Sequence, residues 1–323
     1  MIRTALPTLH AEPDASAILQ TNEAIAPMIH RTPVLTCRSI DEMAGCRLFF
    51  KCENFQKIGA FKMRGASSAA LRLSEEEKSK GLATHSSGNH AQAVAMSARM
   101  LGIPAYIVMP ENAPAIKRAA TEGYGATVTP CTNTLEARES TLEQVVAETG
   151  ATFIHPYNDY NVIAGQASCA KELLEEQPGL EVLIAPVGGG GLISGTALSA
   201  RYFAPGVKVY GAEPSAVDDA YRSFKSGTMQ HNTTTDTVAD GLRTNLGEKT
   251  FRIIQRELED IFLVEESEIV AAMRLVWERM KIIIEPSCAV PLAAVLKYPA
   301  PFAGKNVGLI ITGGNVDVSK LPF

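Results

Sequence analysis

A run of four glycines, residues 188–191, constrains this chain more than any other feature, because it directly follows the apolar residues 182–187. A short apolar run of this kind predicts a buried strand. Glycine has no Cβ, so the backbone after the strand can adopt positive φ and approach a ligand closely. Residues 192–198 predict the start of a helix, whose free N–H groups and dipole face the same point. Together these segments predict a cradle for an anion such as phosphate.

The glycine run differs from two well-known phosphate-binding patterns. The dinucleotide fingerprint has spaced glycines and an acidic residue about 20 positions further on, and a Walker A loop continues into Gly-Lys-Ser/Thr. Neither pattern is present here. The glycine run alone therefore leaves open a tightly packed turn without a ligand.

Composition and charge limit the class of protein. The chain has 323 residues, 46% hydrophobic and 20% charged, as expected for a globular protein large enough for two lobes. Its net charge of −5 argues against nucleic acid or an anionic membrane as the main partner. No apolar run approaches the roughly 20 residues of a membrane span, and no signal-peptide core is present. The six scattered cysteines include no Cys-x-x-Cys pair, which favours free thiols in a reducing cytosol.

Apolar runs alternate with helical patterns, which predicts βαβ units with parallel sheets. Strands are predicted at residues 47–51, 81–85, 104–109, 126–129, 153–154, 182–187, 207–210 and 307–312. Helices are predicted at residues 61–73, 91–101 and 113–122. The block from 81 to 155 predicts a small sheet of its own. We expect a small mobile domain over residues 76–155 and a discontinuous large domain over residues 1–75 and 156–323.

Lys62 stands at the start of a predicted helix, after a glycine turn. The helix dipole disfavours a cation there and, together with burial, lowers the pKa of an amine. Such an amine is suited to forming a Schiff base. Considered alone, an ordinary surface lysine is the more common explanation.

Two other polar turns follow predicted strands. Residues 86–90, Ser-Ser-Gly-Asn-His, place hydroxyls, an amide and backbone N–H groups at a strand-to-helix turn that suits a carboxylate. Helix capping by Ser87 or Asn89 is the alternative. Thr312 and two glycines end the last strand, and ligands of open α/β sheets gather at such carboxyl ends.

These four segments, in this order, resemble the fold-type II pyridoxal-phosphate (PLP) enzymes. The resemblance is to the branch of serine racemases, serine and threonine dehydratases and 3-hydroxyaspartate dehydratases. It extends from residue 31 to residue 317, and residues 277–287 are particularly similar to serine racemase. It implies an α/β fold of the tryptophan synthase β type, with two open lobes and mostly parallel sheets. It also implies a homodimer.

The resemblance implies which residues hold PLP. Lys62 would carry the cofactor as a Schiff base and act as the base on one face of the substrate. Phe61 would pack against the pyridine ring, Asn89 would hydrogen-bond the 3′-oxygen, and Thr312 would meet the ring nitrogen. A neutral hydroxyl at that nitrogen would favour elimination and racemisation over transamination. The phosphate would be bound by Gly188, Gly189, Gly190, Gly191 and the N–H group of Leu192.

The same resemblance implies that Ser86, Asn89 and His90 hold the substrate carboxylate. Ser87 matches the acid/base that serine racemases have on the face opposite the lysine. Racemisation needs a base on each face of the α-carbon, whereas β-elimination can proceed with the lysine alone. A role of Ser87 as a helix cap or carboxylate ligand stays equally open, because many dehydratases also have a serine here.

Arg138 and Thr244 are also matched to the substrate site. If Arg138 faces the site, it can bind a second carboxylate, as in 3-hydroxyaspartate, through a bidentate pair. Alternatively it pairs with Glu139 or Glu143 on an exposed helix. The sequence does not rank serine, threonine and 3-hydroxyaspartate.

A divalent-metal site is expected in residues 211–219. Glu213, Asp219 and the Val217 carbonyl can supply oxygen ligands to Mg²⁺, Ca²⁺ or Mn²⁺, and the segment matches the family's metal site. An acidic exposed loop is the alternative. ATP is a further candidate as an activator, because four residues match positions used for it in mammalian-type racemases: Gln92, Tyr124, Lys281 and Asn315.

The sequence thus predicts a PLP-dependent ammonia-lyase that converts L-serine, L-threonine or 3-hydroxyaspartate to a 2-oxo acid and ammonia, with serine racemase activity as a second capability. One alternative is a β-replacement synthase of the cysteine-synthase type, whose usual Thr-Ser-Gly-Asn-Thr segment differs from residues 86–90. Another is a non-catalytic PLP- or nucleotide-binding protein, which would require loss of the lysine or the phosphate loop. Because the chain ends shortly after Thr312, we expect no C-terminal regulatory domain.

Overall fold

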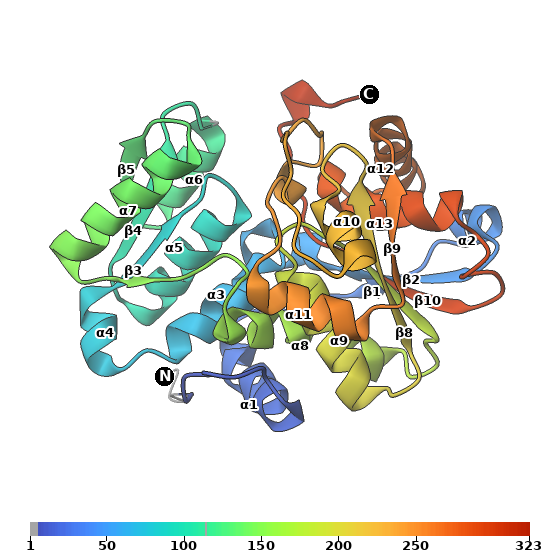
Figure 1. Cartoon of the computed structure of the whole chain (residues 1–323), viewed down its shortest axis with the longest axis horizontal. Helices are drawn as coiled ribbons and strands as arrows, with labels where there is room; N and C mark the ends of the chain where they lie inside the picture. Colours follow the sequence, from blue (N-terminus) through green and yellow to red (C-terminus); the bar gives the residue numbers. More distant parts are fainter. Residues whose placement is uncertain (1–5, 114) are drawn as a thin grey trace.

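Two sheets organise the chain in the computed structural model, which describes residues 6–113 and 115–323 (Figure 1). The strands are β1 (Val34–Leu35), β2 (Arg47–Cys52), β3 (Leu82–His85), β4 (Ala105–Pro110), β5 (Thr127–Cys131), β6 (Thr152–Phe153), β7 (Val182–Pro186), β8 (Lys208–Pro214), β9 (Asp260–Val264) and β10 (Asn306–Ile311). The α-helices are α1 (Ala15–Ile25), α2 (Arg38–Ala44), α3 (Lys62–Leu71), α4 (Glu75–Lys80), α5 (Asn89–Leu101), α6 (Ala115–Gly123), α7 (Leu135–Thr149), α8 (Tyr160–Glu176), α9 (Gly191–Phe203), α10 (Asp219–Ser226), α11 (Glu248–Glu257), α12 (Glu266–Met280) and α13 (Pro286–Lys297). Short 3₁₀ turns include η2 (Glu53–Phe55), η3 (Lys57–Gly59) and η4 (Asp240–Leu242).

The larger sheet has the strand order β1-β2-β10-β7-β8-β9. Its strands pair in parallel, except that β1 runs antiparallel to β2 at the edge. The C-terminal strand β10 is inserted between β2 and β7, so that three segments far apart in the sequence become neighbours. Because these strands are parallel, the segments that follow β2, β10 and β7 all leave the sheet at the same edge.

The core of the large sheet lies on both of its faces, as expected for a parallel sheet. Side chains alternate along each strand: Leu48 and Phe50 join the core under α2, α12 and α13, whereas Phe49 joins the core under α8 and α9. Both cores consist mainly of aliphatic residues with almost no exposed surface. This two-sided burial makes the sheet a rigid support for the loops at its carboxyl edge.

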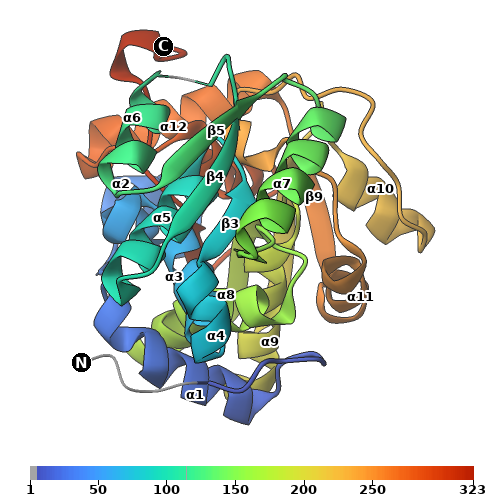
Figure 2. The same ribbon diagram turned by 90° about the vertical axis from the view of Figure 1, so that its left-hand side faces the viewer.

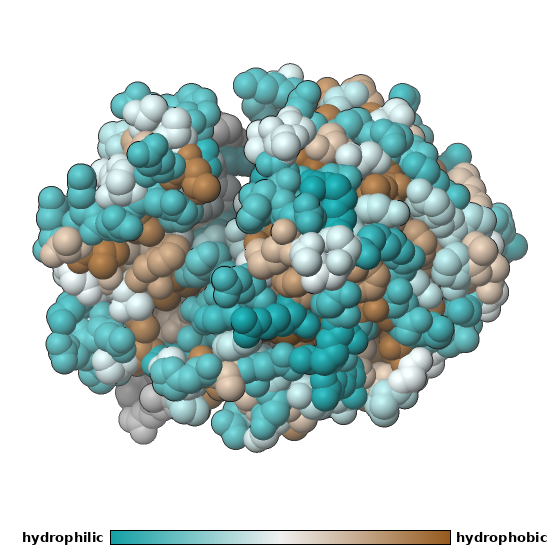
Figure 3. Space-filling view, viewed as in Figure 1, coloured by the Kyte–Doolittle hydropathy of each residue, from teal (hydrophilic) through white to brown (hydrophobic). Residues whose placement is uncertain are grey.

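The smaller sheet has the order β5-β4-β3-β6 and is parallel throughout. Figure 2 looks onto this lobe, where α5 and α6 lie on one side of the strands and α7 on the other. In Figure 3 the surface is hollowed along the line where this lobe meets the rest of the molecule. No α-helix in residues 6–113 and 115–323 is long and apolar enough to cross a membrane.

The predicted strands agree with the structure to within a few residues, and the α/β class with mostly parallel sheets is confirmed. Strand β8 runs on to Pro214, beyond the predicted end at residue 210, because Ala212 and Glu213 are buried and pair with β9. Strands β1 and β9 were not predicted. The limits of the two domains and the mobility of the small one stay predictions.

Helices α3, α8 and α9 approach one another closely beneath the carboxyl edge of the sheet. A Cβ on Gly65 of α3 would overlap Gln166 of α8, and a Cβ on Gly195 of α9 would lie 2.6 Å from the backbone nitrogen of Ala167. The glycines are therefore required by packing. The close contact fixes the position of α3, which begins with Lys62.

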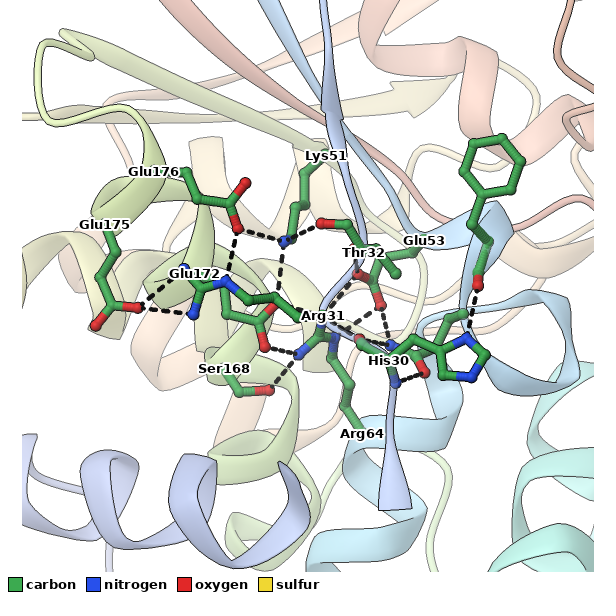
Figure 4. Close-up of polar contacts among 12 residues, drawn as sticks. His30, Arg31, Thr32, Lys51, Glu53, Arg64, Ser168, Glu172, Glu175 and Glu176 are labelled. Carbon is green, nitrogen blue, oxygen red and sulfur yellow. Dashed lines mark hydrogen bonds and ion pairs between the residues drawn. The ribbon is translucent and has the colours of Figure 1, made fainter. Parts of the chain in front are cut away.

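A buried cluster of charged residues joins α3 to β2 and α8 (Figure 4). Arg64 donates two hydrogen bonds to Glu53 of η2, at 2.7 and 2.8 Å, and two to Glu172 of α8, at 2.9 and 2.8 Å. Lys51 of β2 lies 2.9 Å from Glu172. The two positive and two negative side chains are almost completely buried. Because water does not reach them, their opposite charges must compensate one another.

Candidate active site

Three predicted site segments meet at the carboxyl edge of the large sheet. The segment after β2 leads to Lys62, the segment after β10 contains Thr312, and the segment after β7 is the glycine run. A bridge between Ala60 and Gly313, and a 2.9 Å hydrogen bond from the Phe61 N–H to the Thr312 carbonyl, hold the first two segments together. The topology of the sheet thus collects residues that are up to 250 positions apart.

Lys62 is the first residue of α3, and its side chain is half-buried. Nζ donates a 2.8 Å hydrogen bond to the carbonyl of Pro156, in the loop after β6, and lies 5.2 Å from the ring centre of Phe61. Burial lowers the pKa of the Lys62 amine from 10.5 to about 8, although the negative charge of Glu285 opposes this shift. The amine is therefore neutral in about a tenth of molecules at pH 7 and about half at pH 8, far more than for an ordinary lysine, as a nucleophile or base requires.

The glycine run presents a row of free donors. Within the described residues, no backbone N–H group of residues 188–193 donates to a protein acceptor, although residues 191–193 open the 13-residue helix α9. Gly190 has φ +86°, and a Cβ there would lie 2.8 Å from Thr250. A Cβ on Gly189 would overlap the ring of Tyr157. One side of the loop packs tightly against Tyr157 and Thr250. The backbone N–H groups of the loop have no acceptor among the described residues, and such free donors fit a bound phosphate.

Residues 86–90 lie where β3 of the small sheet leads into α5. The Ser86 hydroxyl accepts the N–H of Gly88 at 3.3 Å, and the Ser87 hydroxyl makes no hydrogen bond with a described residue. The Asn89 amide donates to both carboxylate oxygens of Glu285, at 3.0 and 3.2 Å. These contacts bring the small sheet to the same point as the carboxyl edge of the large one.

His90 differs from the expectation. The residue is only 3% exposed, and Nε2 lies 2.9 Å from the carbonyl of Ile154. Burial, with a smaller contribution from the charge of Lys62, lowers its pKa to about 3, so the ring is neutral. A neutral ring whose proton lies on Nε2 offers only an acceptor at Nδ1, and a carboxylate needs a donor. The geometry therefore does not support binding of the substrate carboxylate by the imidazole ring. The backbone N–H of His90 can still donate a hydrogen bond to that carboxylate.

Glu285 and Asn315 form a polar network around Asn89 that the sequence reasoning did not place in the active site. Asn315 donates to the Asn89 side chain at 2.9 Å and to the Ile58 carbonyl at 2.7 Å. Burial and the charge of Asp240 raise the pKa of Glu285 to about 7. A carboxylate directly after the apolar residues 282–284 was the signal that could have marked Glu285.

Thr312 is 3% exposed and lies at the end of β10. Its hydroxyl oxygen is 3.1 Å from Sγ of Cys288, in the first turn of α13. The contact joins residues 24 positions apart, and no local sequence pattern indicated it. Cys288 is thus a further residue at the site that the sequence analysis did not identify.

The two residues matched to substrate specificity lie in different surroundings. Arg138, on α7, donates a 2.6 Å hydrogen bond to Asn133, and its Nε is buried without a described partner. The alternative pairing with Glu139 or Glu143 is not seen in the described part of the chain. Thr244 is exposed, and the neighbouring Arg243 donates to the Thr237 carbonyl, at 3.2 and 2.6 Å.

The expected metal ligands lie together at the end of β8. Glu213 accepts the N–H groups of Ala220 and Tyr221, at 3.2 and 2.9 Å, and Asp219 accepts the Leu246 N–H at 2.8 Å. Burial raises the pKa of both carboxyl groups, and the charge of Asp219 raises that of Glu213 further. Two buried acids that repel each other fit a divalent cation, and the nearby Val217 carbonyl accepts no hydrogen bond from a backbone N–H of the described residues. No group of three or more His, Cys, Asp or Glu side chains that could hold a metal occurs among the described residues.

The residues matched to ATP do not form one group with a shared contact. Gln92 is buried in α5, Asn315 lies in the Asn89 network, and Lys281 ends α12 in a left-handed conformation with φ +60°. Tyr124 packs against the core of the small lobe. Their joint role stays a prediction.

Comparisons with known proteins agree with this geometry. Residues 25–313 match the family model described as pyridoxal-phosphate dependent enzyme. The chain is 49% identical to the beta-hydroxyaspartate dehydratase of Paracoccus denitrificans, over 96% of this chain and 99% of that protein. It is 51% identical to the serine racemase of Dictyostelium discoideum, over 94% and 95%. The solved structure of maize serine racemase superimposes with a TM-score of 0.94 at 44% identity, over 96% of this chain and 95% of that one.

Proposed function

The chain belongs to the family of pyridoxal-phosphate-dependent enzymes, and from this premise we propose that it is an ammonia-lyase for small β-hydroxy amino acids. The reaction would convert the substrate to a 2-oxo acid and ammonia. One observation carries the proposal: the half-buried amine of Lys62, with its pKa of about 8, shares the carboxyl edge of the sheet with a row of backbone N–H groups that have no acceptor among the described residues and fit a phosphate. A nucleophilic amine and an anion cradle are the two features that PLP requires.

The residues around Lys62 would bind and orient the cofactor. When bound, PLP supplies an electron sink for negative charge at the substrate α-carbon. The N–H groups of residues 188–192 would hold its phosphate, Asn89 its 3′-oxygen and Thr312 its ring nitrogen. Phe61 would pack against the ring. Glu285 and Asn315 support this arrangement, because both hydrogen-bond Asn89 and hold its amide in place.

Lys62 would act as the base. Its amine would take the proton from the α-carbon and pass it to the β-hydroxyl, which would leave as water. The released enamine would then hydrolyse to the 2-oxo acid and ammonia. The Pro156 carbonyl, 2.8 Å from Nζ, would orient the amine for this step. The first turn of α5 would hold the substrate carboxylate through its free backbone N–H groups and the Ser86 hydroxyl.

Serine racemase activity is a second candidate, and the Ser87 hydroxyl is the observation that favours it. This hydroxyl lies beside the Asn89 network and has no hydrogen bond to a described residue, so it is free to exchange a proton with a ligand. Racemisation requires such a group on the face opposite Lys62. The 51% identity to the serine racemase of Dictyostelium discoideum supports the same capability.

We further propose 3-hydroxyaspartate as the preferred substrate class, with Arg138 as the ligand of its second carboxylate. The Arg138 guanidinium keeps one buried N–H group without a partner, and no described acidic side chain pairs with it. Relatives named beta-hydroxyaspartate dehydratase and L-threo-3-hydroxyaspartate ammonia-lyase, 49% and 47% identical, support this choice.

The proposal also includes Mg²⁺ bound by Glu213, Val217 and Asp219, ATP as an activator, and a homodimer. The six cysteines are free thiols, which supports the proposed cytoplasmic location.

The test is release of 2-oxo acid by the PLP-loaded protein with Mg²⁺, comparing L-threo-3-hydroxyaspartate with L-serine. We expect release from both and a much larger kcat/KM for hydroxyaspartate. Arg138→Lys should reduce kcat/KM for hydroxyaspartate by roughly 10- to 100-fold and leave serine almost unchanged, because a bidentate pair is lost only with the second carboxylate. Release from neither substrate would refute the lyase proposal, and equal loss on both would refute the role of Arg138.

A further inference from the structure

Cys288 is a buried residue that the proposed reaction does not yet use. Its Sγ lies 3.1 Å from the Thr312 hydroxyl, 2.8 Å from the carbonyl oxygen of Gly313 and 3.0 Å from the Gly313 nitrogen. Cys288 has no exposed surface, and Thr312 is 3% exposed. Water therefore does not compete for these contacts, and their directions are decided within the protein.

Elementary chemistry assigns the hydrogen atoms in this group. Burial, helped by the negative charge of Glu285, raises the pKa of Cys288 well above its usual value, so the side chain is a thiol with one proton. The Gly313 carbonyl can only accept and its N–H can only donate. The thiol therefore donates to the carbonyl, and the sulfur accepts from the N–H group. The remaining contact of the sulfur is with the Thr312 hydroxyl, for which it is a weak acceptor.

We propose that Cys288 is a positioning residue for Thr312: its two hydrogen bonds to the Gly313 backbone hold the adjoining Thr312 in place, and its sulfur is too weak an acceptor to capture the hydroxyl proton, which is presented to the ring nitrogen of the bound cofactor. This inference rests on the proposed function, because it takes Thr312 as the partner of that nitrogen. A hydroxyl that donates to the ring nitrogen keeps the nitrogen unprotonated. Cys288 would thus affect the protonation of the cofactor ring nitrogen, and with it how strongly the ring withdraws electrons, without contacting substrate or cofactor.

Packing alone does not account for these contacts. Cys169, in α8, is equally buried, yet its sulfur makes no hydrogen bond with a described residue. Cys288 instead meets three polar groups, two of them on the backbone of the residue after Thr312. The comparison makes Cys169 a matched control, because its replacement by alanine removes the same atom from an equally buried position.

The test measures protonation of the ring nitrogen. The parent protein and its variants are loaded with PLP labelled with ¹⁵N in the ring, and the pH at which this nitrogen takes up a proton is read by NMR. In Cys288→Ala the two hydrogen bonds to the Gly313 backbone are lost, so the Thr312 hydroxyl is less well held and donates less, and we expect this pH to rise by about 0.4 to 1 unit. Cys288→Ser should raise it too, because a serine oxygen is a stronger acceptor for the Thr312 proton. Cys169→Ala should leave it unchanged.

A double variant shows whether Cys288 acts through Thr312. Thr312→Val removes the hydroxyl, so adding Cys288→Ala to it should cause no further change. An equal shift in both backgrounds would overturn the inference, as would variants of Cys288 that titrate like Cys169→Ala. If Cys288→Ala fails to fold, Cys288→Ser carries the same comparison. A parent protein that binds no labelled cofactor would refute the proposed function itself, an outcome distinct from the others.

Discussion

Lys62 is the residue on which the proposed chemistry depends, and burial shifts the pKa of its amine. An exposed lysine is almost entirely protonated near neutral pH, whereas burial brings the pKa of this amine to about 8. The 2.8 Å hydrogen bond to the Pro156 carbonyl keeps the amine in place in either protonation state. Two elements, α3 and the loop after β6, therefore cooperate to hold a single nitrogen.

The lowered pKa predicts how cofactor capture depends on pH. Only the neutral amine attacks an aldehyde, and the neutral fraction rises as pH increases through the pKa. The rate at which cofactor-free protein captures PLP should therefore rise with pH to a midpoint near 8. Stopped-flow absorbance measures this rate, and Lys62→Ala gives the background. A midpoint near 10.5, the value of an ordinary lysine, would contradict the account.

Glu172 balances two buried cations, Arg64 and Lys51, and its loss should be costly. We expect Glu172→Gln to lower the free energy of unfolding by about 3 to 5 kcal/mol, because it leaves buried positive charge uncompensated. Urea denaturation monitored by circular dichroism measures the change. Glu175→Gln is the control: Glu175 is a half-exposed acid on the same helix, and its loss should cost about 1 kcal/mol or less. Equal effects of the two variants would show that the buried cluster does not hold α3.

At the scale of single elements, the turn between β7 and α9 performs two tasks. Its outer side presents free N–H groups, and its inner side packs against Tyr157, Thr250 and Leu242. The Thr250 hydroxyl also donates to the Gly189 carbonyl at 2.8 Å, which fixes the peptide that follows. A side chain in this turn would disturb the cradle from behind without blocking the phosphate directly.

Gly189→Ala tests this view of the turn. Its Cβ would overlap the Tyr157 ring, so the turn should shift and the affinity for PLP should fall at least tenfold. Fluorescence titration with PLP measures the affinity. Tyr157→Ala combined with Gly189→Ala should recover part of the loss, because the space becomes free. Unchanged affinity in Gly189→Ala would show that the turn is not the phosphate site.

The proposed metal ligands, Glu213 and Asp219, connect β8 and the start of α10 with the segment around residue 246. A cation that binds only the folded state raises the melting temperature, so Mg²⁺ should stabilise the protein and a chelator should remove the effect. Asp219→Asn should abolish this response, because one of the two carboxylates is lost. Asp218→Asn should preserve it, since Asp218 pairs with Arg222 at 2.7 Å. A melting temperature that is indifferent to both Mg²⁺ and chelator would contradict the assignment.

At the scale of the whole molecule, the site lies where two sheets meet. The Asn89–Glu285 hydrogen bonds and the 2.7 Å ion pair between Lys117 and Asp240 both join the small-sheet lobe to the large one. The hollow between the lobes in Figure 3 lies along this junction. Neither lobe alone contains both the cofactor cradle and the residues expected to hold the substrate carboxylate.

Much of this arrangement could be predicted from the sequence, for a physical reason. Buried parallel strands are apolar runs that end in glycine or polar turns, so their positions and the residues at their carboxyl ends are visible locally. Lys62, Thr312 and the glycine run were found in this way. The side-chain directions were not visible: Glu285 and Cys288 reach the site through contacts with Asn89 and Thr312 that only the packing of α13 creates. For His90 the sequence indicated the position, but burial and the Ile154 carbonyl decide the state of the ring.

The most direct test of the central claim is to reduce the PLP-loaded protein with borohydride and map the modified peptide by mass spectrometry. The account predicts a single cofactor attached to Lys62, with no attachment in Lys62→Ala. Attachment to a different lysine, or none in the parent protein, would contradict it.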